Sequence, residues 1–262
     1  MDLGLKDRVA IVAASSRGIG KAAAVGLAAE GCELGLCARN AEAIGRVARE
    51  LESRYRVEVL AQVADVTDPE AVKKFVAAVG ERFGRIDICV TNAGGPPAKQ
   101  FLEIDSEMWR QAFELNLLSV ISFARYVIPW MQRRKWGRII TVTSRSTRQP
   151  LPNLILSNTI RTGVLGLVRS LANDFGRDGI LVNNLAPGAT RTERFAEVAA
   201  ARAKSSGRSM EEVVAEFIAD TATGQLGTPE EVAAAIVWLA SEQASSITGQ
   251  TILTDHGSYR GL

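Results

Sequence analysis

Short apolar, β-branched segments alternate along this chain with longer segments whose apolar positions recur at helical spacing. The segments read as strands are 8–13, 33–38, 57–61, 87–91, 138–143, 180–185 and 248–254. The segments between them, including 41–54 and the long run from Ser106 to about Arg134, are predicted helices. This alternation is typical of βαβ units, so it predicts an α/β fold with a parallel sheet covered on both faces. Ligands are then expected at the carboxyl ends of the strands.

Composition narrows the class of protein. The 262 residues contain no low-complexity linker, which favours one domain over 1–262. The net charge of +2 and the dispersed basic residues do not indicate nucleic-acid binding. The longest apolar runs read as strand-length and the first seven residues lack a signal-peptide layout, so we expect no membrane span and a cytoplasmic location. The three cysteines lie in apolar runs and are expected to be buried thiols. A single histidine, His256, argues against a histidine-based triad and against a metal centre.

A glycine-rich turn follows the first predicted strand. In the stretch ASSRGIG, Gly18 and Gly20 permit a tight turn into a helix whose free amide groups could hold a phosphate. By themselves these glycines fit a plain strand-to-helix turn as well as a nucleotide loop. The next strand ends in Arg39, where an acidic residue would bind both hydroxyls of an adenosine ribose. Arg39 with Arg17 could instead clamp a 2′-phosphate, so we predict a preference for NADP(H) with NAD(H) as the weaker ligand; the alternative is that both are solvated.

Polar residues follow the other strands. Asp65 could accept a hydrogen bond from adenine, whereas Asp68 before Pro69 is predicted to be a helix N-cap. Asn116 lies in an apolar stretch and must bind either a backbone carbonyl or a water chain. The stretch 138–172 joins a strand, a loop with Ser144 and a helix with Arg161, and we expect the chemistry there.

The ordered set SSRGIG, DVTD at 65–68, TNAG at 91–94, Asn116, Ser144 and NNLAPG at 183–188 resembles the short-chain dehydrogenase/reductase family over nearly the whole chain, and within it the 3-oxoacyl-carrier-protein reductases. The resemblance implies a doubly wound, Rossmann-type sheet of about seven strands, a nicotinamide cofactor and a homodimer or homotetramer built on the long central helices. It places the cofactor against Ser16, Arg17, Gly18, Ile19, Gly20, Arg39, Asp65, Val66, Asn92, Ala93, Gly94, Arg161, Pro187, Gly188, Thr190 and Thr192.

The chain departs from the family at its proton donor. The family places a tyrosine thirteen residues after the active-site serine and a lysine four residues later; here those positions hold Ser157 and Arg161. The first glycine of the turn is also replaced, by Ala14. A serine is a far weaker acid than a tyrosine, and Arg161 is expected to keep its proton above a pH of about 12. Arg161 can stabilise an oxyanion or hold a ribose but cannot relay protons as lysine can. The alternative interpretation of Ser144 and Ser157 is that both are ordinary hydroxyls bonded to backbone.

A long segment at 190–224 has helical periodicity and is expected to form a lid over the substrate. Arg145, Arg148, Arg191 and Arg194 could meet near its mouth and favour an acidic substrate or an acyl thioester, although solvated arginines fit equally well. We therefore predict an NADP(H)-dependent oxidoreductase for a carbonyl or alcohol with catalytic Ser144, Ser157, Arg161 and Asn116. The alternatives are a reductase of an activated carbon–carbon double bond and a cofactor-binding protein without turnover.

Overall fold

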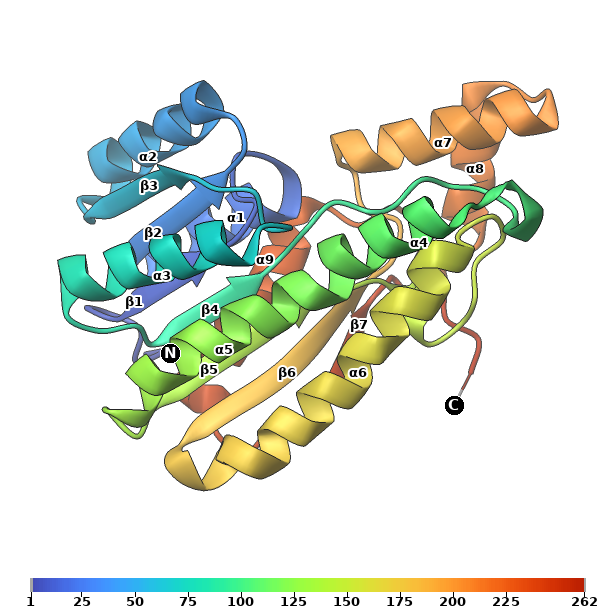
Figure 1. The fold of residues 1–262 in the computed structure, drawn as a ribbon. Coiled ribbons are helices and arrows are strands. Elements are labelled where there is room, and N and C mark those ends of the chain that lie inside the picture. The colour runs from blue at the N-terminus through green and yellow to red at the C-terminus, as the bar shows by residue number, and fades with distance from the viewer. Residues whose placement is uncertain (1, 262) are drawn as a thin grey trace.

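Seven parallel strands form one open sheet in the order β3-β2-β1-β4-β5-β6-β7. The computed structural model describes residues 2–261 (Figure 1). The strands are β1 (Val9–Val12), β2 (Glu33–Ala38), β3 (Val59–Val63), β4 (Ile88–Thr91), β5 (Gly137–Val142), β6 (Ile180–Pro187) and β7 (Thr251–Thr254). The strand order reverses between β1 and β4, which is where open α/β sheets leave a crevice for a ligand. The predicted doubly wound, Rossmann-type sheet is confirmed.

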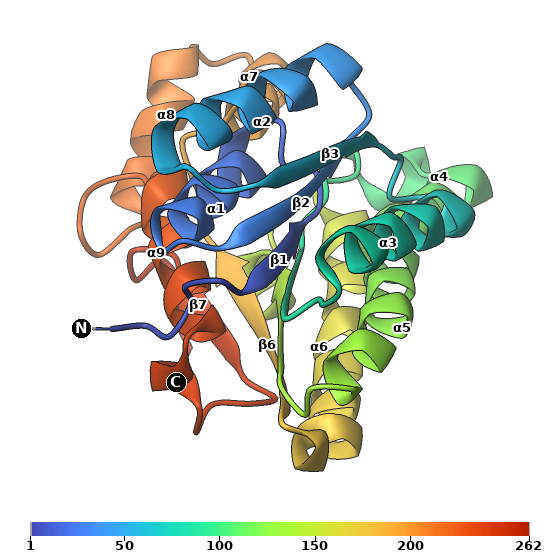
Figure 2. The ribbon, with the colours of Figure 1, turned by 90° about the vertical axis from the view of Figure 1, so that its left-hand side faces the viewer.

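Helices cover both faces of this sheet. They are α1 (Gly18–Ala29), α2 (Ala41–Tyr55), α3 (Pro69–Phe83), α4 (Ser106–Phe113), α5 (Ser119–Gln132), α6 (Ile155–Phe175), α7 (Glu193–Ser206), α8 (Met210–Ala219) and α9 (Pro229–Ala240). The view along the sheet edge separates α1, α2 and α9 on one face from α3, α5 and α6 on the other (Figure 2). Each face therefore has its own apolar core.

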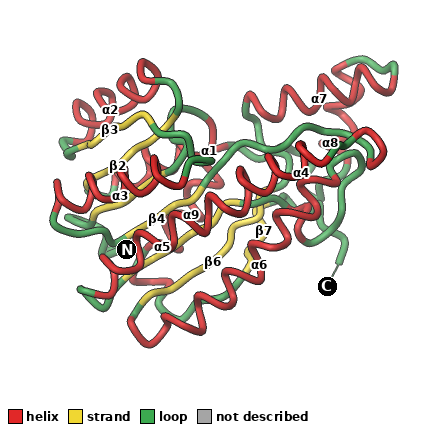
Figure 3. The backbone as a smooth tube through the Cα atoms, viewed as in Figure 1, coloured by secondary structure: helices red, strands yellow, loops and turns green. Residues whose placement is uncertain are grey.

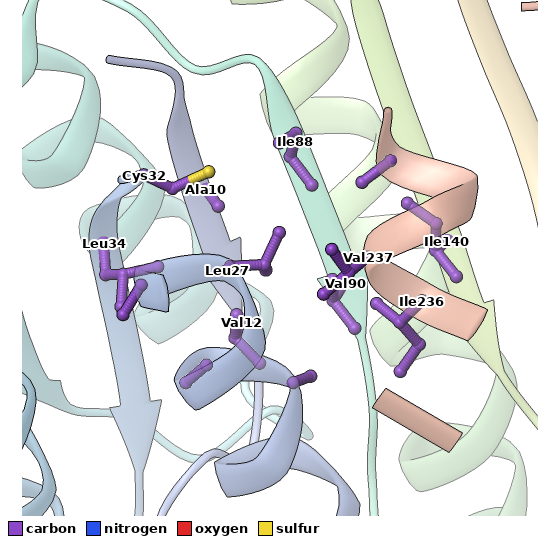
Figure 4. Packing of buried hydrophobic residues seen from close by; sticks show 14 of the residues in the cluster. Ala10, Val12, Leu27, Cys32, Leu34, Ile88, Val90, Ile140, Ile236 and Val237 are labelled. Atoms are coloured by element: carbon purple, nitrogen blue, oxygen red, sulfur yellow. The ribbon is translucent and has the colours of Figure 1, made fainter. Parts of the chain in front are cut away.

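The core under α1 and α9 holds the carboxyl edge of the central strands in place. Leu27 of α1 and Ile236 and Val237 of α9 pack against Val12 and Val90 of neighbouring strands (Figure 4). Full burial of such side chains contributes about 1.5–3 kcal/mol each. The packing of α1 and α9 therefore stabilises the position of the central strands that lead to the site.

Local sequence sets several helix starts. Asp68 accepts a hydrogen bond from the backbone N–H of Glu70 at 2.9 Å, with Pro69 in the first turn, so the predicted N-cap of α3 is confirmed. Thr228 and Glu231 form a capping box at the start of α9. These caps satisfy amide groups that the helix itself leaves free.

Strand boundaries differ from prediction by up to three residues, the largest difference being the start of β7 at Thr251, and two departures have a clear local cause. The third strand begins at Val59 rather than at residue 57, because Arg56 closes α2 in a left-handed conformation (φ +58°) and pairing with β2 starts only two residues beyond Val57. The predicted helix 106–134 is interrupted by a π-helical turn at Glu114–Leu118. By length and composition alone, Ser106–Gln132 is long and apolar enough for a membrane span, but half of its most apolar part is buried inside the protein.

The segment after β6 forms α7 and α8, which stand beyond the carboxyl edge of the sheet (Figure 1). Phe195 and Phe217 hold the two helices together with ring centroids 5.2 Å apart. The loop that follows β4 runs beneath α7 to the start of α4 (Figure 3).

Cys32, Cys37 and Cys89 are buried free thiols, as predicted, and burial raises the pKa of Cys37 to about 12.

Candidate active site

A cavity of about 800 Å³ opens at the carboxyl edge of the sheet, between the strand ends and α7. It brings together most of the residues that the sequence predicts for cofactor and substrate. Those that line it are Ser16, Arg17, Gly18, Ile19, Arg39, Asp65, Val66, Asn92, Ala93, Gly94, Ser144, Arg145, Ser157, Arg161, Pro187, Gly188, Thr190 and Thr192. Gly20, Asn116, Arg148 and Arg191 do not line it.

The glycine-rich turn forms one end of the cavity. Helix α1 starts at Gly18 (φ +55°), and the side chain of its N-cap residue, Arg17, accepts no hydrogen bond from the first amide groups. Such a terminus can bind a phosphate. Gly20 is buried, and a Cβ there would overlap the carbonyl oxygen of Ala14, so its part is to let the turn close. Ala14, which the sequence resemblance aligns with a glycine, adopts φ +48°, a conformation that costs a non-glycine residue about 1 kcal/mol.

Two arginines and one carboxylate line the part of the cavity near the ends of β1, β2 and β3. Arg17 and Arg39 both line the cavity, and neither has a carboxylate within 4.0 Å among residues 2–261. Asp65 lines the cavity too, while one of its oxygens accepts from the N–H and the hydroxyl of Thr67 at 2.9 and 2.8 Å. This end therefore offers free guanidinium groups to an anion.

The carbonyl oxygen of Gly94 lies between two donors from different helices. Arg161 donates to it from Nη2 at 3.0 Å, and Asn116 donates from Nδ2 at 2.8 Å. Arg161 also donates to the carbonyl of Val142 at 3.2 Å. Asn116 thus takes the backbone option that the sequence left open, yet its Oδ1 is buried without a partner within residues 2–261. Its place behind the cavity wall makes it a positioning residue for the loop after β4.

Arg161 is a buried cation. Only 7% of its surface is exposed, and the described part of the chain places no carboxylate within ion-pair distance. Burial, with the positive charge of Arg194, lowers the pKa of Arg161 to about 10. The expectation of a proton held above pH 12 is therefore corrected, although Arg161 remains charged at neutral pH.

Three serines form a hydroxyl cluster beside Arg161. Ser144 closes β5 with its Oγ accepting from the N–H of Ser146 at 3.2 Å. Ser157, in the first turn of α6, lies with its Oγ 3.2 Å from that of Ser146. Ser144 and Ser157 line the cavity, whereas Ser146 lies behind them. Sequence reasoning missed Ser146, because its contact with Ser157 depends on how α6 packs against the loop.

The four arginines expected at the cavity mouth do not all meet there. Arg145 lines the cavity, but its guanidinium pairs with Asp220 at 2.5 Å and donates to the carbonyl of Ser258 at 2.7 Å. Arg148 and Arg191 are exposed and lie outside the cavity. The fourth of these arginines, Arg194 of α7, lines the cavity near Arg161.

The geometry combines a phosphate-binding turn with a polar wall of hydroxyls and a cation, and comparison with known proteins identifies the family. A family model described as "Enoyl-(Acyl carrier protein) reductase" matches residues 13–259. The chain belongs to the short-chain dehydrogenase/reductase family. This short-chain dehydrogenase/reductase is 32% identical over 266 residues to an "uncharacterized oxidoreductase YvrD" of Bacillus subtilis, covering 100% of both chains. It is 31% identical to the 3-oxoacyl-[acyl-carrier-protein] reductase FabG of Vibrio cholerae, covering 98% of this chain and 99% of that one.

Solved structures resemble this short-chain dehydrogenase/reductase along its full length. The L-sorbose reductase of Gluconobacter frateurii, complexed with NADPH and L-sorbose, matches with a TM-score of 0.94 and 32% identity, covering 100% of both chains. The sequence-based resemblance is thereby confirmed, and the protein is an oxidoreductase of this family. Within this frame Ser157 and Arg161 lie on α6, at the positions that the sequence resemblance assigns to a tyrosine and a lysine.

Proposed function

We propose that this protein is an NADP(H)-dependent oxidoreductase that interconverts a carbonyl and an alcohol, with Ser144, Ser157 and Arg161 around the reacting oxygen. One observation carries this proposal: these three residues line the same cavity as the glycine-rich turn. A dinucleotide bound from that turn toward α6 would have its reactive end beside them.

The residues present fit the cofactor. The uncapped start of α1 and the close packing of Gly20 suit a pyrophosphate, and Arg17 and Arg39 suit a 2′-phosphate. A Cβ at Gly94 would meet no atom within 4 Å, so the wall after β4 leaves room for a ribose. The NADPH complex of the sorbose reductase supports the phosphorylated form. NAD(H) is the weaker ligand in this proposal.

Each site residue then has a separate task. When bound, the nicotinamide supplies or accepts the hydride. Ser144 donates a hydrogen bond to the substrate oxygen, and Arg161 stabilises the negative charge that develops on that oxygen during reduction. Because neither a serine hydroxyl nor this guanidinium is a good proton donor at neutral pH, the proton on the new alcohol comes from water that Ser157 orients.

A second candidate is a reductase of an activated carbon–carbon double bond. The buried charge of Arg161 favours it, since a fixed cation can stabilise an enolate that solvent protonates later. The description of the matched family model is in line with this reaction.

The test is the absorbance of reduced nicotinamide during incubation with panels of ketones, alcohols and enoyl thioesters. We expect turnover with NADPH that falls at least about a hundredfold in Ser144→Ala and Arg161→Met, the usual effect of removing an oxyanion donor. If no panel changes the absorbance although NADPH binds tightly, the protein binds its cofactor without turnover and the proposal fails.

We also propose a cytoplasmic homo-oligomer, a dimer or tetramer, that acts on small molecules. Buried reduced thiols suit a reducing compartment. Phe101, Leu102 and Phe113, exposed by 61%, 94% and 40%, give the region of α4 apolar surface that a subunit contact could cover. Light scattering on the purified protein would measure the assembly, and a monomer at all concentrations would refute it.

A further inference from the structure

Arg161 of α6 and Arg194 of α7 reach the loop after β4 from two different elements. Arg161 donates to the carbonyl of Gly94 at 3.0 Å, and Arg194 donates from Nη2 to the carbonyl of Pro96 at 2.5 Å. Arg194 also lies against Gly95, where a Cβ would stand 3.0 Å from its Nη2. Both residues line the cavity. They therefore form a pair of cations over one short stretch of backbone.

The positive charge of this pair is poorly balanced. Arg161 has no carboxylate within 4.0 Å in residues 2–261, and Arg194 pairs only with Glu197 of its own helix, at 3.3 Å. Both side chains of that pair are partly exposed, 38% and 55%, so solvent screens their attraction. Glu114, Glu193 and Glu197 line the cavity, and of these three only Glu197 comes within 4.0 Å of Arg194, while none reaches Arg161, so the two cations share one partly solvated carboxylate. A buried cation without a counter-charge is unfavourable, and an anion from solution would relieve it.

This pair is separate from the cations expected to hold the dinucleotide phosphates. Arg17 and Arg39 follow β1 and β2, whereas Arg161 shares its helix with Ser157 and donates to Val142, two residues before Ser144. An anion between Arg161 and Arg194 therefore lies at the substrate end of the cavity. Each planar guanidinium still has N–H groups beyond those bound to carbonyls, and their fork matches a carboxylate.

We propose that Arg194 and Arg161 bind a carboxylate that the substrate carries close to its reacting carbon. The substrate class is then an oxo acid and the hydroxy acid formed from it. This inference rests on the proposed oxidoreductase function and adds Arg194 as a specificity-determining residue.

The binding experiment uses oxamate, an unreactive oxo-acid analogue, and oxamide, its uncharged counterpart, titrated calorimetrically into the full-length protein saturated with NADP⁺. We expect oxamate to bind at least about tenfold more tightly than oxamide, as for a charge-assisted pair. Arg194→Met should abolish this difference and Arg194→Lys should keep part of it. The matched control is Lys204→Met, which removes an exposed cation of the same helix outside the cavity and should leave the difference intact.

Three outcomes decide the inference. Equal binding of oxamate and oxamide to the unaltered protein overturns it, as does a preference for oxamate that survives Arg194→Met. If Arg194→Met instead weakens NADP⁺ binding about tenfold or more, Arg194 serves the cofactor phosphates and the carboxylate site is wrong.

Turnover separates this inference from the function on which it rests. Reduction of neutral ketones with no advantage for 2-oxo acids over their methyl esters would leave the oxidoreductase proposal standing and remove the carboxylate site. A preference for oxamate without turnover of any substrate would support the carboxylate site and contradict the oxidoreductase proposal.

Discussion

The guanidinium of Arg161 donates to the carbonyl oxygen of Gly94, 3.0 Å away, and so ties α6 to the loop after β4 with a charged group. That loop and the start of α6 form two walls of the same cavity. A residue that fixes the shape of the site thus also supplies its buried positive charge.

Arg161 gives the first prediction, a pH dependence. Burial and Arg194 lower its pKa to about 10, below its ordinary value but well above neutrality. If turnover needs the charged form of Arg161, kcat/KM should not change with the protonation of Arg161 around neutral pH. It should fall as the pH rises through about 10, where Arg161 loses its proton. A pH profile of kcat/KM measures this, with protein stability checked at each pH. A rate that depends on Arg161 yet rises steadily above pH 10 would contradict the role given to its charge.

The hydroxyl cluster gives the second prediction. Ser157 leaves the space in which the family resemblance places a tyrosine, beside a cavity of about 800 Å³. The double variant Ser157→Tyr with Arg161→Lys should restore a proton donor and raise kcat for ketone reduction about tenfold or more. Its control is Ser157→Phe with Arg161→Lys, which has the same ring without the hydroxyl. Equal rates for the two variants would show that proton donation does not limit the reaction.

Cofactor choice is the third prediction. Arg39→Asp replaces a cation that could bind a 2′-phosphate with an acceptor for ribose hydroxyls, so the preference should move from NADP⁺ toward NAD⁺ by about ten- to a hundredfold. Fluorescence titration of both cofactors measures the two dissociation constants. Arg49→Asp changes the same charge on the exposed side of α2 and should leave the ratio unchanged. Tighter binding of NAD⁺ than of NADP⁺ by the unaltered protein would contradict the assignment.

Arg145 gives the fourth prediction, on stability. It joins the loop after β5 to Asp220, next to α8, and to the carbonyl of Ser258. Its side chain is only 9% exposed, so Arg145→Met should lower the free energy of unfolding by about 1–3 kcal/mol. Arg260→Met removes a second cation from Asp220, 3.7 Å away and 60% exposed, and should cost less than about 0.5 kcal/mol. Urea unfolding measures the free energy of unfolding of both variants. Equal losses of stability would contradict the larger contribution expected of the buried Arg145.

The alternation of apolar segments was enough to predict the sheet, because buried parallel strands and amphipathic helices impose different spacings on the sequence. Where local conformation decides, prediction was less exact: the left-handed turn at Arg56 delays β3, and the π-helical turn inside 106–134 has no periodic signal. The site divides in the same way. Residues at strand ends, such as Ser144 and Asn92, follow from topology.

Contacts between distant segments could not be predicted. Arg145 and Arg194 look alike in the sequence, and both line the cavity. Arg145 is nevertheless held by Asp220, whereas Arg194 reaches the carbonyl of Pro96, and only the packing of α7 and α8 decides these partners. The contact between Ser146 and Ser157 likewise depends on how closely α6 packs against the loop after β5.

The central claim is that hydride moves between a nicotinamide and a substrate carbon held beside Ser144 and Arg161. The most direct measurement uses NADPH with deuterium in place of the transferable hydrogen, incubated with the panel of ketones, oxo acids and enoyl thioesters and followed by mass spectrometry of the products. We expect deuterium on the former carbonyl carbon of the product, and no deuterated product from the Arg161→Met variant. Products without deuterium from every panel, despite tight binding of NADPH, would contradict it.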